Sequence, residues 1–513
     1  MLRKIAVLAL ISASVTVVGV TTATERALAA PVTLSEISAS PLVANFAGWD
    51  MGFATNSLFS SAAVGDVTGD GQPDVVVGGM NSVARVYDLA VSRVIALDPG
   101  GANAATGQGA TQPSPALGDI NGDGVDDVVI GNTGGRLAAY SVRNGVATQL
   151  YNHFVAPAFD GALVGLLGTP AVGYIDRDTN LDVVSSSWGQ TVDVWSGPTG
   201  QPIPQLRQWL RDTIWSSPVI GDISGDGVSE IVVGADCEGS GTPQPCHGIG
   251  QGGYVWAFNL DGSVRWSYFV RDAVVWSTPA LIDLNNDGAR DVVVGTGLYF
   301  LGPAANRIMA IDGRTGQLMW NAATGGPVLG SPAVGLVNGH PRVWIVSGGG
   351  MLMSWNAAGQ LQWQQCVMDQ PCSPGAGTFG GVAIADVNND GTLDAVVQAE
   401  QTLRVLNAVT GSSQTSVRSR YQHGLLPSFA TPTVASVNGK TWIVQVNIGD
   451  PNGNWQADGG DDLVVSIWTT GTALGAAPWP TFKGNMARTG GPESVPPPQP
   501  VVPSGRACFK VSG

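Results

Sequence analysis

The sequence is poor in charged side chains and in side chains that could act as general bases. Only 12% of the 513 residues are charged. The chain has four lysines, and its four histidines share no common spacing, so no catalytic or metal-binding histidine cluster is indicated. No Gly-x-Ser-x-Gly elbow for a nucleophilic serine is present, and no cysteine–histidine pair stands out. No motif in the sequence therefore indicates nucleophilic catalysis.

The sequence also lacks a basic stripe and any long apolar run beyond the N-terminus. The formal net charge is −15, and without clustered Lys and Arg the chain lacks the electrostatic footprint of a nucleic-acid-binding protein. The apolar run from Ile5 to Val20 follows Arg3 and Lys4 and precedes Ala27-Leu28-Ala29. This is the pattern of a signal peptide over residues 1–29. We therefore expect a secreted protein, extracellular or attached to the cell surface, with no transmembrane segment.

The chain is rich in turn-forming residues and in one repeated acidic loop. It holds 71 Gly and 32 Pro. Nine-residue loops recur with oxygen-bearing side chains at positions 1, 3, 5 and 9 and with glycine at position 6. Such a loop can turn sharply and place several hard oxygen ligands around one calcium ion. The intact loops begin at Asp66, Asp119, Asp222, Asp283 and Asp386.

These loops differ from EF-hands. An EF-hand needs a bidentate glutamate at position 12. Here position 12 is apolar, and the carboxylate at position 9 leads directly into a Val/Ile run, so each loop opens a strand rather than a helix. The residues at position 12 are Val77, Ile130, Val233, Val294 and Val397.

The loops resemble the FG-GAP/VCBS repeats of integrin-α-type β-propellers. The resemblance implies that each loop joins the first two strands of a blade and binds one Ca²⁺, with the backbone carbonyl of position 7 completing the site. The implied ligand residues are Asp66, Thr68, Asp70, Gln72 and Asp74; Asp119, Asn121, Asp123, Val125 and Asp127; Asp222, Ser224, Asp226, Val228 and Glu230; Asp283, Asn285, Asp287, Ala289 and Asp291; and Asp386, Asn388, Asp390, Thr392 and Asp394.

The number of repeats predicts the number of blades. Two further units keep the strands but replace the acidic loop by short turns, Asn338-Gly339 and Asn438-Gly439, which need no metal to close. With the intact loops and one shortened copy, these units predict an all-β propeller of eight four-stranded blades, with seven as the alternative. The shortened copy lacks two residues of the pattern and leaves a sixth calcium site open. Its acidic and amide residues are Asp176, Asp178, Asn180 and Asp182.

A second repeat supports the propeller. Segments such as Ala310–Trp320 and Ala257–Trp266 alternate, turn and end on an aromatic residue, which is typical of a hairpin. They are similar to the blades of quinoprotein-like propellers. We assign residues 61–490 to the ring and residues 30–60 to a segment that closes the last blade, since an open ring would leave bare sheet edges.

The cysteines and the C-terminal tail give weaker indications. Short spacings predict disulfides Cys237–Cys246 and Cys366–Cys372 in an oxidising compartment, with Cys508 left over. Residues 491–513 form a Pro-rich spacer and a short tail. The tail is interpreted as disordered, or as the truncated beginning of a carbohydrate-binding module, which it resembles.

Two groups of tryptophans lead to different expectations. Trp215 and Trp276 occupy matching positions in two repeats and are expected to pack between blades. Trp188, Trp209 and Trp455 do not repeat, and an exposed indole there could stack on a sugar.

Three hypotheses of function remain open. The first is a monomeric, non-enzymatic binding or adhesion protein for a glycan or an extracellular protein. The second is a polysaccharide-active enzyme that resembles rhamnogalacturonan lyases, which are calcium-containing propellers; its base would have to come from few lysines or from Arg, His or Tyr. The third is a quinone-dependent dehydrogenase, prompted by the hairpins. Fold alone cannot choose among them, because propellers host unrelated activities.

Overall fold

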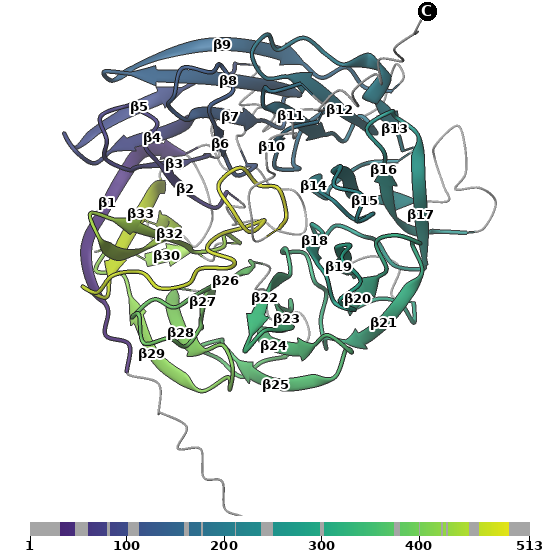
Figure 1. Ribbon diagram of the computed structural model, residues 1–513. Coiled ribbons are helices and arrows are strands. Elements are labelled where there is room, and N and C mark those ends of the chain that lie inside the picture. The colour runs from purple at the N-terminus through teal and green to yellow at the C-terminus, as the bar shows by residue number, and fades with distance from the viewer. Residues whose placement is uncertain are drawn as a thin grey trace, which may run out of the picture.

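The protein is a ring of eight β-sheets arranged as the blades of a propeller (Figure 1). The computed structural model describes residues 31–46, 60–79, 83–100, 112–158, 164–175, 178–210, 212–237, 250–297, 302–373, 380–399, 401–421, 424–426, 429–450 and 461–491. The predicted fold class and the predicted eight blades are confirmed. Among these residues no helix is long and apolar enough to span a membrane.

The first four blades follow one another along the chain, each built from four antiparallel strands in sequence order. Blade 1 is β2 (Ala63–Gly65), β3 (Asp74–Val77), β4 (Ala84–Asp88) and β5 (Arg93–Leu97); blade 2 is β6 (Ala116–Gly118), β7 (Asp127–Gly131), β8 (Arg136–Arg143) and β9 (Val146–Phe154); blade 3 is β10 (Ala171–Gly173), β11 (Asp182–Ser186), β12 (Thr191–Ser196) and β13 (Gln208–Trp209), with the 3-10 helix η1 (Pro204–Leu206); blade 4 is β14 (Val219–Gly221), β15 (Glu230–Cys237), β16 (Gly252–Phe258) and β17 (Val264–Arg271).

The other four blades complete the ring, and the last one also takes up the N-terminal strand. Blade 5 is β18 (Ala280–Ile282), β19 (Asp291–Gly295), β20 (Arg307–Ile311) and β21 (Leu318–Ala323); blade 6 is β22 (Ala333–Val337), β23 (His340–Val346), β24 (Met351–Asn356) and β25 (Leu361–Cys366); blade 7 is β26 (Val382–Ala385), β27 (Asp394–Ala399), β28 (Thr402–Asn407) and β29 (Ser413–Arg418); blade 8 is β31 (Thr433–Val437), β32 (Lys440–Asp450) and β33 (Asp461–Thr469), with β30 (Gly424–Leu426) and β1 (Ser35–Phe46).

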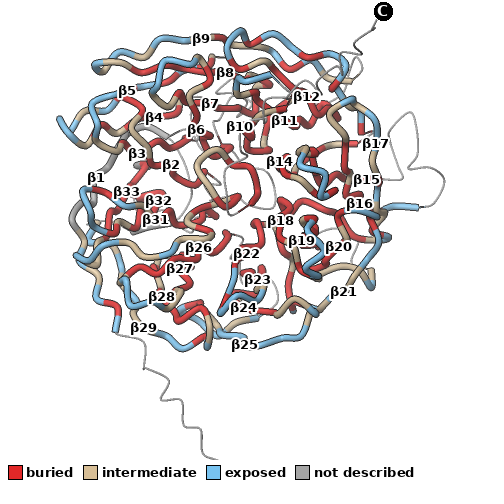
Figure 2. The backbone as a smooth tube through the Cα atoms, viewed as in Figure 1, coloured by how far each residue is buried: buried red, intermediate tan, exposed pale blue. Residues whose placement is uncertain are grey.

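The core lies between neighbouring blades. The second strand of a blade reads as an unbroken apolar run, because both of its faces are covered by adjacent sheets. In β19, for example, all five residues are buried. Figure 2 shows that buried backbone gathers in the inner part of the ring and exposed backbone along its outer edge. One apolar cluster joins the side chains of blades 1 and 2, and another those of blades 4 and 5.

The ring is closed by the N-terminal strand. Strand β1 pairs antiparallel with β33 and forms the outer strand of blade 8. The Glu36 carboxylate accepts hydrogen bonds from the backbone N–H and the Nε of Arg420, at 2.8 and 2.9 Å. This pairing joins the two ends of the ring and covers the edge that β33 would otherwise expose.

A segment after the last strand fills the centre of the ring, which the sequence did not indicate. Residues 475–491 pass through the middle of the blades (yellow in Figure 1). Backbone carbonyls of this segment accept the N–H groups of innermost strands in six blades. The pairs, at N···O distances of 2.7–2.9 Å, are Leu117 with Met486, Val172 with Ala487, Ile220 with Thr489, Leu281 with Gly490, Ile384 with Trp479 and Val434 with Pro480.

Two buried cations hold this central segment to the blades. The Arg488 side chain is fully buried and donates to the carbonyls of Pro115 and Ala62, both at 2.9 Å. The Lys483 ammonium is also fully buried and donates to the carbonyl of Thr169 at 3.1 Å. Burial, followed by the charge of Arg488, lowers the pKa of Lys483 well below its usual value.

The predicted disulfide between Cys366 and Cys372 is present, with a Cα–Cα distance of 5.7 Å. Cys237 is also disulfide-bonded. Its predicted partner Cys246, the leftover Cys508 and the predicted signal peptide lie outside the described residues.

We expect Arg488→Met to lower the free energy of unfolding by about 3 kcal/mol or more, because it leaves several buried carbonyls without donors and each such loss costs about 1–3 kcal/mol. Urea unfolding followed by tryptophan fluorescence measures this. The control is Arg314→Met, which removes a half-exposed ion pair with Asp287 and should cost less than about 1 kcal/mol. Equal, small losses in both variants would contradict a stabilising central segment.

Candidate calcium loops and the groove beside them

Each of the five acidic loops joins the first and second strands of a blade, as the resemblance implied. The loops connect β2 to β3, β6 to β7, β14 to β15, β18 to β19 and β26 to β27. Because every blade runs in the same direction through the ring, all five loops lie on one face of the propeller, which we call the loop face.

The aspartate at position 1 organises the turn of its loop. In the first loop, Asp66 Oδ1 accepts the N–H of Gly69 at 2.7 Å and Asp66 Oδ2 accepts the N–H of Gly71 at 2.8 Å. Gly71, at position 6, has φ +81°, a conformation that L side chains rarely adopt. The position-1 carboxylates of the other intact loops accept the N–H of the position-6 glycine in the same way, at 2.8–3.0 Å.

The aspartate at position 5 lies at the exposed tip of the loop. Asp70 Oδ1 accepts the N–H of Gln72 at 2.8 Å, which leaves the second oxygen of that carboxylate uncommitted. In two loops an arginine forms an ion pair with the position-5 carboxylate: Arg143 pairs with Asp123, and Arg314 with Asp287. The N–H of Ala289 contributes most to lowering the pKa of Asp287, and Arg314 adds to it.

The carboxylate at position 9 is buried and ties the second strand to the end of the first. Asp74, Asp127, Glu230, Asp291 and Asp394 are each at most 2% exposed. Four of them accept the backbone N–H of position 2 at 2.9–3.1 Å. In the second loop the N–H of position 3 takes this role, at 3.2 Å.

Burial raises the pKa of all five position-9 carboxyls. Desolvation is the largest cause at every site. It raises the pKa of Asp74, Asp127 and Asp291 to about 6 and that of Asp394 to about 7, and that of Glu230 above its usual value. Five buried carboxylates with raised pKa values are groups that a bound cation would stabilise in the charged form.

The carboxylate oxygens at position 9 that do not accept the loop's backbone N–H differ in their partners, and this difference bears on how well each loop could bind calcium. Asp74 Oδ1 is buried and has no hydrogen-bond partner. The Glu230 side chain instead pairs with Arg265 at 3.2 Å, and Asp394 accepts a hydrogen bond from Gln414 at 2.8 Å. All the candidate ligand atoms in every loop are oxygens, which are the ligands that Ca²⁺ takes. In the part of the chain that the structure describes, however, no three His, Cys, Asp or Glu side chains form a preassembled metal cluster.

The shortened copy of the loop is only partly described. Asp176 lies outside the described residues. Asp182 opens β11 and accepts the N–H of Ile175 at 3.1 Å, so it occupies the place of a position-9 carboxylate. Asp178 and Asn180 hydrogen bond to each other. The sixth calcium site stays a prediction.

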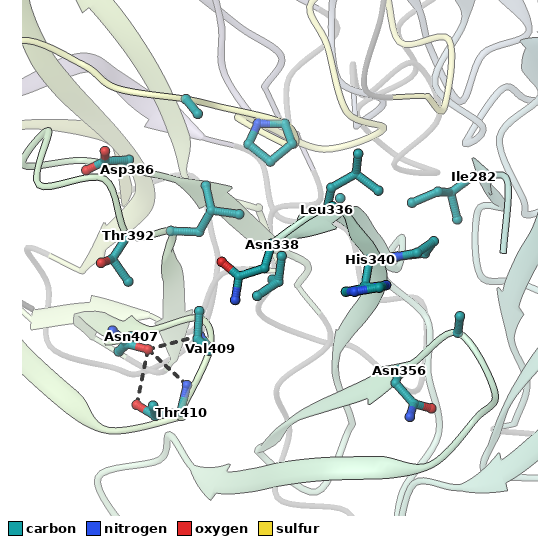
Figure 3. Close-up of a pocket in the computed structure, with 18 of the residues that line it drawn as sticks. Ile282, Leu336, Asn338, His340, Asn356, Asp386, Thr392, Asn407, Val409 and Thr410 are labelled. Carbon is teal, nitrogen blue, oxygen red and sulfur yellow. Dashed lines mark hydrogen bonds between the residues drawn. The ribbon is translucent and has the colours of Figure 1, made fainter. Parts of the chain in front are cut away.

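The loop face carries a groove where blade 6 lacks an acidic loop. Strands β22 and β23 are joined by the tight turn at Asn338 and Gly339, whose φ values are +52° and +77°. The longer loops of blades 5 and 7 project on either side of this turn and leave a groove of about 2150 Å³, the blade-6 groove. In Figure 3, Leu336, Asn338 and His340 lie between Asp386 and Thr392 on one side and Ile282 on the other.

Sequence reasoning missed this groove. The Asn-Gly turn of blade 6 was recognised in the sequence, but the depression exists only because the neighbouring blades keep their loops. The outer rim of the groove also depends on how two blades lie side by side, because it includes Asn356, Asn407 and Thr410 from the outer hairpins of blades 6 and 7.

The tryptophans behave partly as expected. The Trp215 and Trp276 rings stack across blades 4 and 5 with centroids 4.3 Å apart, which confirms inter-blade packing. The expectation of an exposed ring is wrong for Trp188. This residue is 7% exposed, and its ring centroid lies 4.9 Å from that of Trp215. Trp209 is 50% exposed. Trp455 lies outside the described residues.

Two family descriptions match parts of this ring. The FG-GAP repeat matches residues 112–149, which include the acidic loop of blade 2. The description "Outer membrane protein assembly factor BamB" matches residues 251–374 and 307–458, from blade 4 to blade 8. Blades 4 to 8 are therefore similar to BamB, and blade 2 is similar to an FG-GAP repeat.

One curated protein is similar over a short stretch. The chain is 41% identical over 78 residues to the glycerol dehydrogenase large subunit of Gluconobacter thailandicus. The match covers 15% of this chain and only 10% of that protein.

Solved structures resemble the whole ring at low sequence identity. The biofilm matrix protein Bap1 of V. cholerae is 13% identical, with a TM-score of 0.52, over 86% of this chain and 92% of that one. A europium-containing methanol dehydrogenase is 11% identical, with a TM-score of 0.54, over 85% and 93%. The quinohemoprotein alcohol dehydrogenase of Comamonas testosteroni is 12% identical, with a TM-score of 0.50, over 86% and 77%. These likenesses show the fold alone. Together with the repeated loops and the blades, they identify the chain as an eight-bladed β-propeller that carries FG-GAP repeats.

Proposed function

We propose that the chain is a secreted, calcium-binding propeller that holds a glycan or an extracellular protein without transforming it. The observation that carries the binding role is the blade-6 groove, an open surface between two acidic loops on the loop face. Surfaces built from loops on a rigid ring suit recognition, because the scaffold positions the loops without restricting their sequences.

Calcium would be held by the side chains at positions 1, 3, 5 and 9 and by the carbonyl at position 7 of each loop. The ion would supply positive charge beside a buried carboxylate such as Asp74, whose Oδ1 lacks a partner, and so offset the cost of its burial. Residues such as Asp66 already fold each turn through backbone hydrogen bonds. A structural role for the ion follows, since it would brace the walls of the groove rather than take part in chemistry.

A quinone-dependent dehydrogenase is the second candidate. It is favoured by the similarity to a glycerol dehydrogenase subunit over 78 residues and by the fold shared with a quinohemoprotein alcohol dehydrogenase. Addition of pyrroloquinoline quinone to the calcium-loaded protein, with an alcohol panel and an artificial electron acceptor, tests it. Dye reduction that requires both quinone and alcohol would establish the dehydrogenase and overturn the non-enzymatic proposal.

Neither of the two described lysines supports the lyase hypothesis. Lys483 is fully buried at the centre of the ring and donates to backbone carbonyls, so it is not accessible as a base to a polysaccharide on the surface. Lys440 is exposed beside the turn of blade 8, away from the blade-6 groove.

Removal of calcium should lower the melting temperature of the purified protein, and added calcium should restore it. A ligand that binds only the native state stabilises it by about 2.7 kcal/mol at a free concentration of 100 times its Kd. Differential scanning fluorimetry with chelator and with calcium measures the shift. An unchanged melting temperature would contradict calcium bracing.

We expect Asp226→Ala to remove one calcium ion per chain and to leave the other loops filled. Asp226 is the position-5 ligand of the blade-4 loop, and its Oδ1 accepts only a local N–H, from Val228 at 2.8 Å. The matched control is Asp261→Ala in the outer turn of the same blade, which should keep the full complement of ions. Metal analysis after equilibrium dialysis distinguishes the two. Equal calcium contents in both variants would show that the blade-4 loop binds none.

The calcium-free protein should lose stability as the pH rises. In the folded state the pKa of Asp74, Asp127 and Asp291 is raised to about 6 and that of Asp394 to about 7, above the ordinary value near 4 of the unfolded chain. Their protonation therefore favours folding fully at low pH, and this contribution is lost as the pH rises through the folded pKa. Melting temperatures in chelator should fall from about pH 5 to about pH 8.

Saturating calcium should weaken this pH dependence, because the ion replaces the proton as the group that stabilises the buried carboxylates. Asp394→Asn, measured in chelator, should also weaken it. A melting temperature in chelator that stays flat or rises over this pH range would contradict the account.

A further inference from the structure

Blades 6 and 8 have matching short turns, but their surroundings differ. In blade 8, Val437 and Lys440 pair across the turn as Val337 and His340 do in blade 6. The space that a longer loop would fill in blade 8 is taken by the protein's own chain after β33. The N–H of Thr441 donates to the carbonyl of Thr472 at 2.7 Å.

The same chain segment is also attached to the neighbouring loop of blade 7. The hydroxyl of Thr470 donates to the Val387 carbonyl at 2.9 Å. The N–H of Gly475 then donates to the carbonyl of Asp386, also at 2.9 Å. In blade 6 the corresponding space is the open blade-6 groove. Among the described residues, one short-turn blade is thus covered by the chain itself, and the other borders an open groove.

An extended peptide could not cover blade 6 in the way that the chain covers blade 8. The position of Thr441 is occupied in blade 6 by Pro341, which has no N–H to donate. The backbone bond that holds Thr472 in blade 8 therefore has no counterpart in blade 6. This difference argues for a ligand that is held by side chains rather than through its peptide backbone.

The lining of the blade-6 groove is rich in amides and hydroxyls, and it also holds the charged residues Asp283, Arg290 and Asp386. Asn338, Asn356, Thr392 and Thr410 contribute such groups from four separate turns. Amides both donate and accept hydrogen bonds, as the hydroxyl groups of sugars do. The exposed Leu336 side chain, 55% exposed, adds an apolar patch on the floor.

The size and the charge of the groove further restrict the class of ligand that it could bind. Its volume of about 2150 Å³ exceeds the ~300–1,000 Å³ of ordinary small-molecule pockets, so it suits a segment of a polymer. The lining holds two carboxylates, Asp283 and Asp386, and one guanidinium, Arg290, and the chain has a net charge of −15. A polyanion would therefore gain no net attraction from this surface.

We propose that the blade-6 groove binds a segment of an uncharged polysaccharide, several sugars long, through the amide and hydroxyl side chains of these turns and the apolar floor at Leu336. The inference rests on the binding function proposed above and assigns that function a ligand class and a place.

Matched charge substitutions in blades 6 and 8 test the proposal that the blade-6 groove binds an uncharged polysaccharide. Leu336→Glu places a carboxylate on the floor of the groove, and Ser436→Glu places one at the equivalent exposed position of blade 8. The calcium-loaded full chain is run in affinity gels that contain neutral polysaccharides (dextran, galactomannan, xyloglucan) or polygalacturonate. We expect the wild type to be retarded by at least one neutral polymer. Leu336→Glu should weaken this binding about tenfold or more, and Ser436→Glu less than about twofold.

A second matched pair guards against misfolding of the first variant. His340→Ala removes a hydrogen-bonding ring from the groove, whereas Lys440→Ala removes the equivalent exposed side chain of blade 8. The blade-6 variant alone should bind more weakly, and both should melt as the wild type does.

The outcomes separate the two proposals. Retention only by polygalacturonate, capture only of peptides or proteins, or equal effects in blades 6 and 8 would overturn the assignment of this groove and leave the binding function standing. The release of shortened or oxidised sugars, or the absence of retention by any glycan or extracellular protein, would overturn the binding function itself.

Discussion

The buried carboxylate at the start of the second strand is the interaction on which the rest of the loop face depends. In the intact loops this side chain accepts a backbone N–H from the beginning of the loop, as Asp291 does from Leu284 at 2.9 Å. The bond fixes the turn between the two innermost strands, and the burial that makes it strong also raises the pKa of the carboxyl. One geometric constraint thus sets the register of the blade and creates an electrostatic cost that calcium binding would relieve.

The ring itself is held by segments from the two ends of the chain. Strand β1 completes blade 8 from the outside, and the segment around Trp479 and Arg488 covers the edges of the innermost strands from the inside. Sheet edges left open invite pairing with other chains, so a propeller must cover both its closing blade and its centre. The same C-terminal segment covers blade 8 on its way to the centre, whereas at blade 6 its residues Ala476 to Pro478 only line the groove.

Much of the fold could be predicted from the sequence, because the spacing of Asp, Asn and Gly in each loop is a local pattern that recurs in register. The short turn at Asn338 was recognised for the same reason. The central segment could not be predicted, since its bonds are made by backbone carbonyls to strands 46 to 369 residues away, and no side-chain pattern marks a carbonyl. Lys483 is one of the few lysines that could have supplied a base, but it is buried. Trp188 was expected at the surface and is instead packed against Trp215. Each of these depends on a neighbouring blade and not on the residue itself.

A recognition role is consistent with this arrangement, in which a rigid ring carries acidic loops and one open groove on the same face. The account depends most on the identification of the loops as calcium sites, because both the bracing of the groove walls and the stabilisation of the buried carboxylates follow from it. The most direct test is a calorimetric titration of the metal-depleted full chain with Ca²⁺ and, separately, with Mg²⁺. The account predicts saturable binding of one Ca²⁺ per intact loop, with much weaker binding of Mg²⁺. The absence of calcium binding, or a single ion per chain, would contradict it.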